Sequence, residues 1–443
     1  MLALLVVLTT GLTTVLAQPA PAATSRIDFQ GRALLVLSDA DMLASAYVNG
    51  KLGPSSNTDS LSLIALGAAP DQLKAKVLPM SNSVAGPPVA VATSPDGRFA
   101  FVVETFQPRP AGKEDAVFAD LAPGSKMRVI DLTDLANPRT VQAVDTPLRP
   151  DSVSVSSDGR WVVIAIHPQG GGAQNPLAFY PFADGQLGRA QTPVVPRWRA
   201  GERLIHAEFH PNQAVIGLVN ESRGELAFVR MDTSAPTVQL TPWGNIVQTE
   251  KSPYMVRFTP DGRHAISNAL YWGADVQGNW NEAPRGSVLS VRLNARSSAD
   301  GTPVHSLVSR ATVGVSPEGI AISPDGRWVA STNLERSFLP EGDPRLTPFA
   351  SISLLRLDAK NGTLSRVGDY AYDGILPEAA AFDASSRFLA VATFDHFAGC
   401  KRGGSVDFWR LTGDSLDPER VELVKTNLSI PVVRGAHSVI LVK

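Results

Sequence analysis

The sequence has a single cysteine, Cys400, among its 443 residues. One thiol forms no internal disulfide and cannot supply a cysteine-rich zinc site, so neither feature is expected to hold the fold together. An excess of one charge is also missing, because 40 lysines and arginines stand against 42 aspartates and glutamates, a formal net charge of −2. This balance removes any general electrostatic case for binding nucleic acid or an anionic membrane, and no nucleic-acid partner is expected.

Long apolar runs are absent except at the N-terminus, where residues 2–17 read LALLVVLTTGLTTVLA. The run ends in Val15-Leu16-Ala17, and its compact residues suit signal-peptidase cleavage before Gln18, although the first basic residue is only Arg26. We predict a signal peptide over residues 1–17, a mature domain over 18–443, and a periplasmic or secreted protein without stable membrane insertion after cleavage. An uncleaved anchor is the alternative, weakened by the short length of the run.

Turn-forming residues are plentiful: glycine and proline together make up about 16% of the chain, against roughly 12% in average usage. A Ser-Pro-Asp-Gly-Arg phrase or a close variant recurs at steps of 49 to 64 residues, each time between alternating apolar stretches. Asp-Gly between two such stretches is typical of a tight β-hairpin. Two further alternating stretches follow in each unit, so the repeat predicts four-stranded blades of a β-propeller. The copies begin at Ser94, Ser156, His210, Thr259, Ser323 and Asp383.

The two ends of the chain complement each other. Residues 31–37 match the second strand of a unit but have no first strand before them, and residues 435–442 match a first strand with nothing after it. We therefore predict an all-β, seven-bladed propeller of four-stranded blades, closed by the C-terminal strand joining the N-terminal blade.

Two blades carry a family resemblance. The stretch from Ile205 to Asn212, with Asn220-Glu221 after it, and the stretch from Pro317 to Arg327, with Ser331-Thr332-Asn333, resemble the lactonase-type seven-bladed propellers. That family includes cytosolic 6-phosphogluconolactonase and the YVTN-repeat proteins. The resemblance implies a lactonase-like hydrolase acting on a lactone or related cyclic ester.

The resemblance has departures that bear on function. The family's arginine before the blade histidine is Ile205 here, and its second arginine is Leu334, with Arg336 two residues later. His206 and Glu221 are candidates for a base and its orienting partner, with Arg336 as a charge-binding third catalytic group. The alternative is that His206 and Glu221 only satisfy polar groups lining the channel.

Long insertions all fall between the second and third strands of a unit, which places them on one face of the ring. The blade of Glu221 has only a short link there. The expected site is therefore this face of the ring, which long loops surround except for a gap at the blade of Glu221. Candidate substrate-binding residues come from these loops and from the last innermost strand, whose orientation depends on a one-residue register. They are Trp272, Trp280, His396, Lys401, Arg402 and His437.

No phosphate loop, nucleophile elbow or repeated metal-ligand spacing is present, so no cofactor and no metal are expected. Two functions remain open from the sequence. One is an exported lactonase-like enzyme with a small-molecule substrate. The other is a non-enzymatic propeller that binds a small molecule, a glycan or a protein partner through the face that long loops surround.

Overall fold

The computed structural model describes residues 27–55, 57–83, 85–170, 174–271, 284–397, 403–413 and 420–443. The predicted signal peptide lies outside these residues and stays a prediction. Within them the chain is all-β apart from short helical turns, and no helix is long and apolar enough to cross a membrane. The turns are α1 (Ala46–Asn49) and the 3₁₀ turns η1 (Pro70–Gln72), η2 (Phe118–Asp120), η3 (Pro168–Gly170) and η4 (Glu221–Arg223).

The repeated Asp-Gly phrase forms the predicted hairpin. In the copy at Ser156, the carboxylate of Asp158 accepts hydrogen bonds from the Ser156 hydroxyl (2.6 Å) and the Arg160 amide (3.1 Å). The Trp161 amide in turn donates to the Ser156 hydroxyl at 2.9 Å. Gly159 has a φ of 73°, in the left-handed region that favours glycine. Local side-chain chemistry thus sets each turn and the register of the two strands beside it.

The described strands form seven antiparallel sheets, arranged as blades around an axis, which confirms the predicted propeller. The strands of each blade follow one another from the innermost, at the axis, to the outermost. The first three blades are β29 (Ala436–Val442), β1 (Ala33–Ser38), β2 (Ser60–Ala65), β3 (Ala75–Pro79); β4 (Val91–Thr93), β5 (Phe99–Val103), β6 (Lys126–Asp131), β7 (Arg139–Asp145); and β8 (Pro150–Val155), β9 (Trp161–Ile166), β10 (Leu177–Ala183), β11 (Gln186–Leu187). The next two are β12 (Leu204–Phe209), β13 (Val215–Asn220), β14 (Glu225–Asp232), β15 (Gln239–Pro242), with β16 (Val247–Gln248) also on β14; and β17 (Pro253–Phe258), β18 (His264–Ala269), β19 (Arg285–Ser297), β20 (Pro303–Val315). The last two are β21 (Pro317–Ile322), β22 (Trp328–Asn333), β23 (Ala350–Leu357), β24 (Leu364–Tyr372); and β25 (Gly374–Phe382), β26 (Phe388–His396), β27 (Ser405–Thr412), β28 (Glu422–Pro431).

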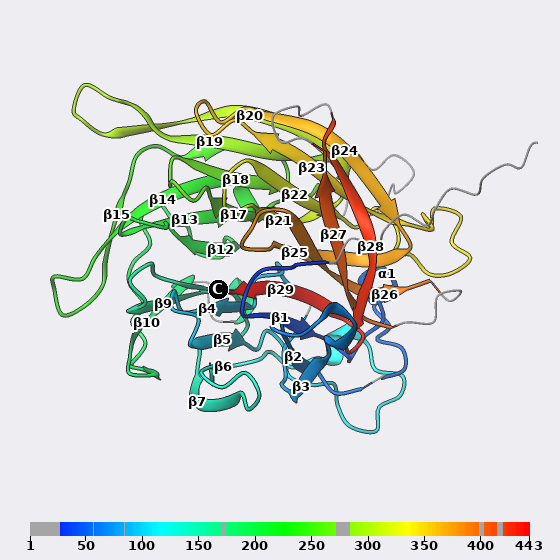
Figure 1. Ribbon diagram of the computed structural model, residues 1–443. Helices are drawn as coiled ribbons and strands as arrows, with labels where there is room; N and C mark the ends of the chain where they lie inside the picture. The colour runs from blue at the N-terminus through cyan, green and yellow to red at the C-terminus, as the bar shows by residue number, and fades with distance from the viewer. Residues whose placement is uncertain are drawn as a thin grey trace, which may run out of the picture.

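The first blade is the predicted composite of both chain ends. Figure 1 shows β29, in red, beside β1, in blue, and the two strands pair antiparallel with Leu35 opposite Ile440. Outside the ladder, the Arg32 amide donates to the Val442 carbonyl (2.9 Å), and His437 Nε2 donates to Asn82 Oδ1 (2.7 Å) on the segment leading to the next blade. Both ends are therefore tied into the ring.

The hydrophobic core lies between blades rather than inside one sheet. Leu34 and Val36 of β1 pack in one cluster with Phe408 of β27, and Phe101 of β5 packs in another with Ile164 of β9. Each cluster joins neighbouring blades, so a blade depends for burial on the blades beside it.

The described insertions between second and third strands lie on one face of the ring, as predicted. Three of them, after β1, β5 and β22, pack on each other through a buried apolar cluster with Phe394. In contrast, residues 221–224 connect β13 to β14 by one short turn. Among the described connections, the loop face is thus a packed cap that is thin at the link between β13 and β14.

Removing residues 435–443 should destabilise the whole ring. The deletion exposes the edge of β1 and uncovers the apolar side chains on it, each worth about 1.5–3 kcal/mol when buried. Thermal unfolding followed by circular dichroism should show a lower, broader transition, while deletion of Lys443 alone should leave it unchanged. A melting curve identical to that of the full chain would contradict closure by β29.

Candidate functional site

The innermost strands share an irregularity at their loop-face ends. Six of the seven contain a β-bulge with an extra residue, whereas β4 pairs without a shift. The bulge follows the first paired residue in five of these strands and follows Pro377 in β25. A bulge re-aims the side chain at that point, and bulges are common beside active sites. The residues in this position are Asp151, Ile205, Tyr254, Glu318, Glu378 and His437.

Several of these side chains point toward the axis. Burial raises the pKa of Tyr254 well above its usual value, and the carboxylates of Glu318, Glu221 and Glu378 add to this effect. Tyr254 and Glu378 lie on blades that are not neighbours, with the β21 blade between them. Charges on non-adjacent blades act on one another at close range only near the centre of a ring. The bulge residues Tyr254 and Glu318 line one small cavity together with loop-face residues of other blades, so these two reach the loop-face end of the central channel.

Arg203 is held between two carboxylates at this end of the channel. Its Nε lies 3.4 Å from Asp151 Oδ2 on β8, and its Nη1 lies 3.1 Å from Glu221 Oε2 on η4. The Arg203 side chain keeps 22% of its surface exposed and Glu221 keeps 19%, whereas Asp151 is fully buried beneath them. Among the described residues, none forms a hydrogen bond with Nη2 of Arg203. This nitrogen is left available to a ligand.

The short turn of residues 221–224 explains why Arg203 and Glu221 meet. The Arg203 amide donates to the Ser222 hydroxyl (2.8 Å), and the Glu221 amide donates to the Arg203 carbonyl (3.0 Å). These bonds hold the segment before β12 against η4, so both side chains reach the thin part of the cap.

His167 and Arg149 also lie close to Arg203 and Asp151. Burial lowers the pKa of His167 to about 3, and the charges of Arg203 and Arg149 act in the same direction. Burial raises the pKa of Asp151 to about 6, against the lowering effects of Arg203 and Arg149. The cluster therefore offers a neutral imidazole, guanidinium groups and a carboxylate that titrates near neutrality.

His206 lies elsewhere. It is fully buried between blades, where its Nδ1 accepts a hydrogen bond from the Val256 amide (3.1 Å) and its Nε2 lies 3.5 Å from Glu208 Oε2. Burial lowers the pKa of His206, and Arg257 pairs with Glu208 at 3.0 Å. The expected pairing of His206 with Glu221 is not formed, because the one-residue register turns His206 toward the neighbouring blade.

The other predicted site residues have separate surroundings. Arg336, in the loop after β22, lies with its Nε 3.3 Å from Thr347 Oγ1. His396 Nε2 lies 2.9 Å from the Ser405 hydroxyl at the end of β26, and His437 binds Asn82. The structure does not bring His396 or His437 into contact with Arg203. Trp272, Trp280, Lys401 and Arg402 lie outside the described residues.

Three carboxylates gather after β1. Oxygens of Asp39, Asp41 and Asp59 lie within 4.8 Å of one another. The Ala40 amide donates to Asp59 (2.9 Å) and the Arg109 amide donates to Asp41 (2.8 Å), while burial and the two other carboxylates raise the pKa of Asp59 to about 9. Amides of this loop and of the insertion after β5 donate to all three carboxylates, and we assign no metal to the group.

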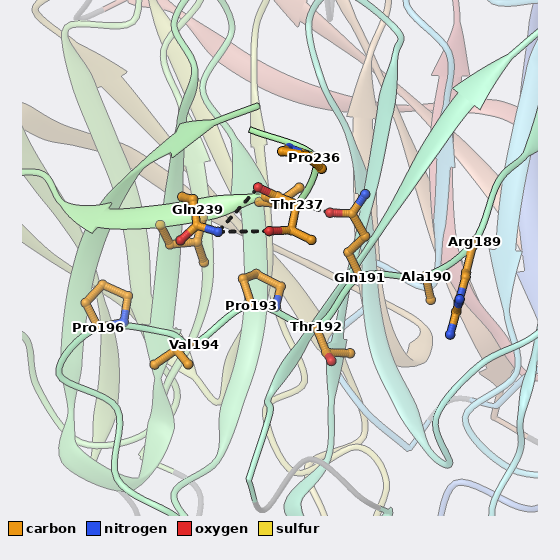
Figure 2. Close-up of a pocket in the computed structure, with 12 residues that line it drawn as sticks. Arg189, Ala190, Gln191, Thr192, Pro193, Val194, Pro196, Pro236, Thr237 and Gln239 are labelled. Carbon is orange, nitrogen blue, oxygen red and sulfur yellow. Dashed lines mark hydrogen bonds between the residues drawn. The ribbon is translucent and has the colours of Figure 1, made fainter. Parts of the chain in front are cut away.

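A surface hollow lies at the rim, away from the channel. It has a volume of about 730 Å³ and is lined by residues 189–194, 196 and 236–240. Figure 2 shows its proline and threonine side chains, with Gln239 donating to Thr237. Arg189 is the ionisable group on its wall. The hollow lacks a constellation of reactive groups, so we place the candidate site at the channel instead.

Sequence reasoning missed Asp151, Arg203, Tyr254, Glu318 and Glu378. A usable signal was present: proline stands just before the bulge in four innermost strands, each time followed by a polar residue. Proline fits strand starts and bulges because it donates no ladder hydrogen bond. The four pairs are Pro150-Asp151, Pro253-Tyr254, Pro317-Glu318 and Pro377-Glu378.

Asp151 should make folding stability depend on pH. The pKa of Asp151 is about 6 in the folded state, above its unfolded value of about 4. Its contribution to the free energy of unfolding is therefore fully present below pH 4 and is lost as pH rises through 6. The loss amounts to up to about 3 kcal/mol. Asp151→Asn should therefore gain stability relative to the parent between pH 4 and 7, as measured by urea unfolding.

The exposed Asp232 provides the matched control, because a backbone hydrogen bond from Ser234 lowers its pKa. Because its pKa is lowered from an ordinary value of about 4, Asp232→Asn should change the pH dependence only below pH 4, where the contribution of Asp232 is lost as pH falls, and should leave it unchanged between pH 4 and 7. A difference between Asp151→Asn and the parent that stays constant across this pH range would contradict the raised pKa.

Comparisons with known proteins give the fold. No family model matches the chain, and no curated protein matches it. Among solved structures, a candidate 6-phosphogluconolactonase from Bacteroides uniformis is similar with a TM-score of 0.60 and 18% identity over 93% of this chain and 99% of that one. A second from Bacteroides fragilis gives 0.58 and 16%, over 95% and 99%. The periplasmic gluconolactonase of Pseudomonas aeruginosa gives 0.59 and 18%, over 92% and 98%. This chain therefore has the seven-bladed propeller fold of lactonase-like structures.

Proposed function

We propose that the chain is a lactonase that hydrolyses a lactone or related cyclic ester at the loop-face end of its channel. The observation that carries the proposal is the geometry of Arg203. Two carboxylates fix its Nε and Nη1, and no described residue forms a hydrogen bond with its Nη2. A guanidinium held in this way is preorganised for an oxygen that becomes negative during reaction. The shared fold with gluconolactonase-type structures supports the same activity.

Each residue then has a distinct role. Glu221, the more accessible carboxylate, takes a proton from water as the water oxygen bonds to the carbonyl carbon. Arg203 stabilises the resulting oxyanion, with Arg149 adding positive charge nearby. The ring carbon–oxygen bond then breaks, and the proton passes to the leaving alkoxide, which yields an open-chain hydroxy acid. Asp151, buried below, positions Arg203.

Turnover of a lactone panel should depend on these two accessible groups. We expect Arg203→Met to reduce kcat/KM at least ~100-fold, because it removes the charge facing the oxyanion. Glu221→Gln should cause a loss of at least ~100-fold by removing the base.

Arg223→Met is the matched control. Arg223 lies on the same 3₁₀ turn but pairs with Glu225 at 2.8 Å, so its loss should change turnover only a few-fold. His206→Ala should lower stability through its interblade contacts and leave the turnover of folded enzyme largely intact. Folded parent protein that hydrolyses none of the lactones would instead favour a non-enzymatic ligand-binding propeller.

We also propose that the chain is exported. The apolar run over residues 2–17, the compact residues before Gln18 and the single cysteine support this location. Expression in a Gram-negative host should place the protein in the periplasm with Gln18 as its first residue, as read by fractionation and N-terminal sequencing. Leu5→Arg with Val7→Arg should retain it in the cytoplasm. Cytoplasmic recovery of the unaltered chain would contradict the proposal.

A further inference from the structure

Two carboxyl groups in the channel wall have no partner among the described residues. Glu318 of β21 is 6% exposed, and Glu378 of β25 is 0% exposed. Neither side chain forms a hydrogen bond or an ion pair within the described chain, and both Glu378 oxygens are buried without a hydrogen-bond donor. Buried carboxyl groups are normally paired, because removing their charge from water is costly. Their presence together points to a group supplied from outside the chain.

Glu318 opens onto a small cavity at the axis. The cavity measures about 50 Å³ and is lined by side chains from four blades. This volume suits a small polar head group or a few water molecules and is too small for a sugar ring. The lining residues are Tyr47, Tyr254, Leu270, Glu318, Leu334 and Leu376.

The charges around the pair are mostly of the same sign. Burial raises the pKa of Glu318 to about 8, and burial together with Glu318 and Asp39 raises that of Glu378 well above its usual value. Tyr47 on α1 and Tyr254 on β17 also feel both glutamates. Arg203, before the adjacent β12 blade, acts on Tyr254, but Asp151 and Glu221 already hold it, so it is not a dedicated counter-ion of the two glutamates.

We propose that Glu318 and Glu378, with the rings of Tyr47 and Tyr254, form a binding site for an organic ammonium group of a ligand. Carboxylates supply the opposite charge, and tyrosine faces attract cations of this kind. The walls formed by Leu270, Leu334 and Leu376 suit the carbon chain of an amine. A calcium ion requires six to eight oxygen ligands, and the leucine walls do not supply them. The site does not depend on whether the channel hydrolyses lactones.

Binding should be measured on the full folded chain with propylammonium, and with neutral 1-butanol as a probe of similar shape. We expect propylammonium to bind at least ~10-fold more tightly in calorimetry. Its affinity should rise from pH 6 to pH 8.5, because the glutamates must lose protons before they bind a cation. The heat of binding should vary with the ionisation enthalpy of the buffer, as it does when protons are released.

Glu318→Gln should abolish the preference for the amine, and Glu378→Gln provides a second test if the first variant does not fold. Glu225→Gln, which removes a carboxylate paired with Arg223 outside the channel, should leave binding unchanged. Equal binding of 1-butanol and propylammonium, or no amine binding by the folded parent, would overturn the proposal. Calcium chloride and potassium chloride should each be tested without the amine. If either binds tightly and the binding is lost in Glu318→Gln, the two glutamates would form a metal site instead.

Discussion

Antiparallel pairing of β29 with β1 is the contact on which the remaining architecture depends. A propeller blade buries its apolar faces against two neighbours, so an open ring would expose two faces and two sheet edges at once. The pairing of β29 with β1 covers these faces and these sheet edges. His437 adds a hydrogen bond to Asn82, which lies on the segment leading to the next blade. A closed ring in turn fixes the distance of every innermost strand from the axis, and the chemistry of the channel depends on that distance.

The bulges convert this symmetric scaffold into an asymmetric site. The same irregularity recurs at the same height in most blades, but the side chain it presents differs from blade to blade. On one side of the channel, Arg203 is clamped by Asp151 and Glu221. On another, Glu318 and Glu378 have no cation from the described chain. The bulges therefore position Asp151, which holds Arg203, as well as the two unpaired glutamates, and a ligand that contacts both groups would be oriented by both.

The fold was predictable from the sequence because its determinants are local. The Asp-Gly turns carry their own hydrogen bonds, as the contacts of Asp158 show, and the complementary ends reveal the composite blade. Glu221 lies on the blade with the short link at the loop face, as the sequence indicated, and its role in a site stays a prediction. The site as a whole was harder to predict, because a bulge shifts side-chain direction by one residue without leaving a break in the alternating pattern. His206 was expected beside Glu221 from the family resemblance, but the register of β12 turns it toward the neighbouring blade, and its Nε2 lies 3.5 Å from Glu208 Oε2. Arg203 precedes its strand, and only the three-dimensional course of residues 221–224 shows that it reaches the channel.

The composite blade also has a consequence for biogenesis. β1 is the first described strand of the chain, yet its innermost partner β29 follows every other described strand. During synthesis β1, β2 and β3 emerge without the strand that shields them, and the other blades can stack before the first one is complete. The circle can lock only after the C-terminal strand leaves the ribosome. A chaperone that holds the early strands apart would therefore act over nearly the whole time of synthesis, and a chain truncated near its end would keep an adhesive sheet edge.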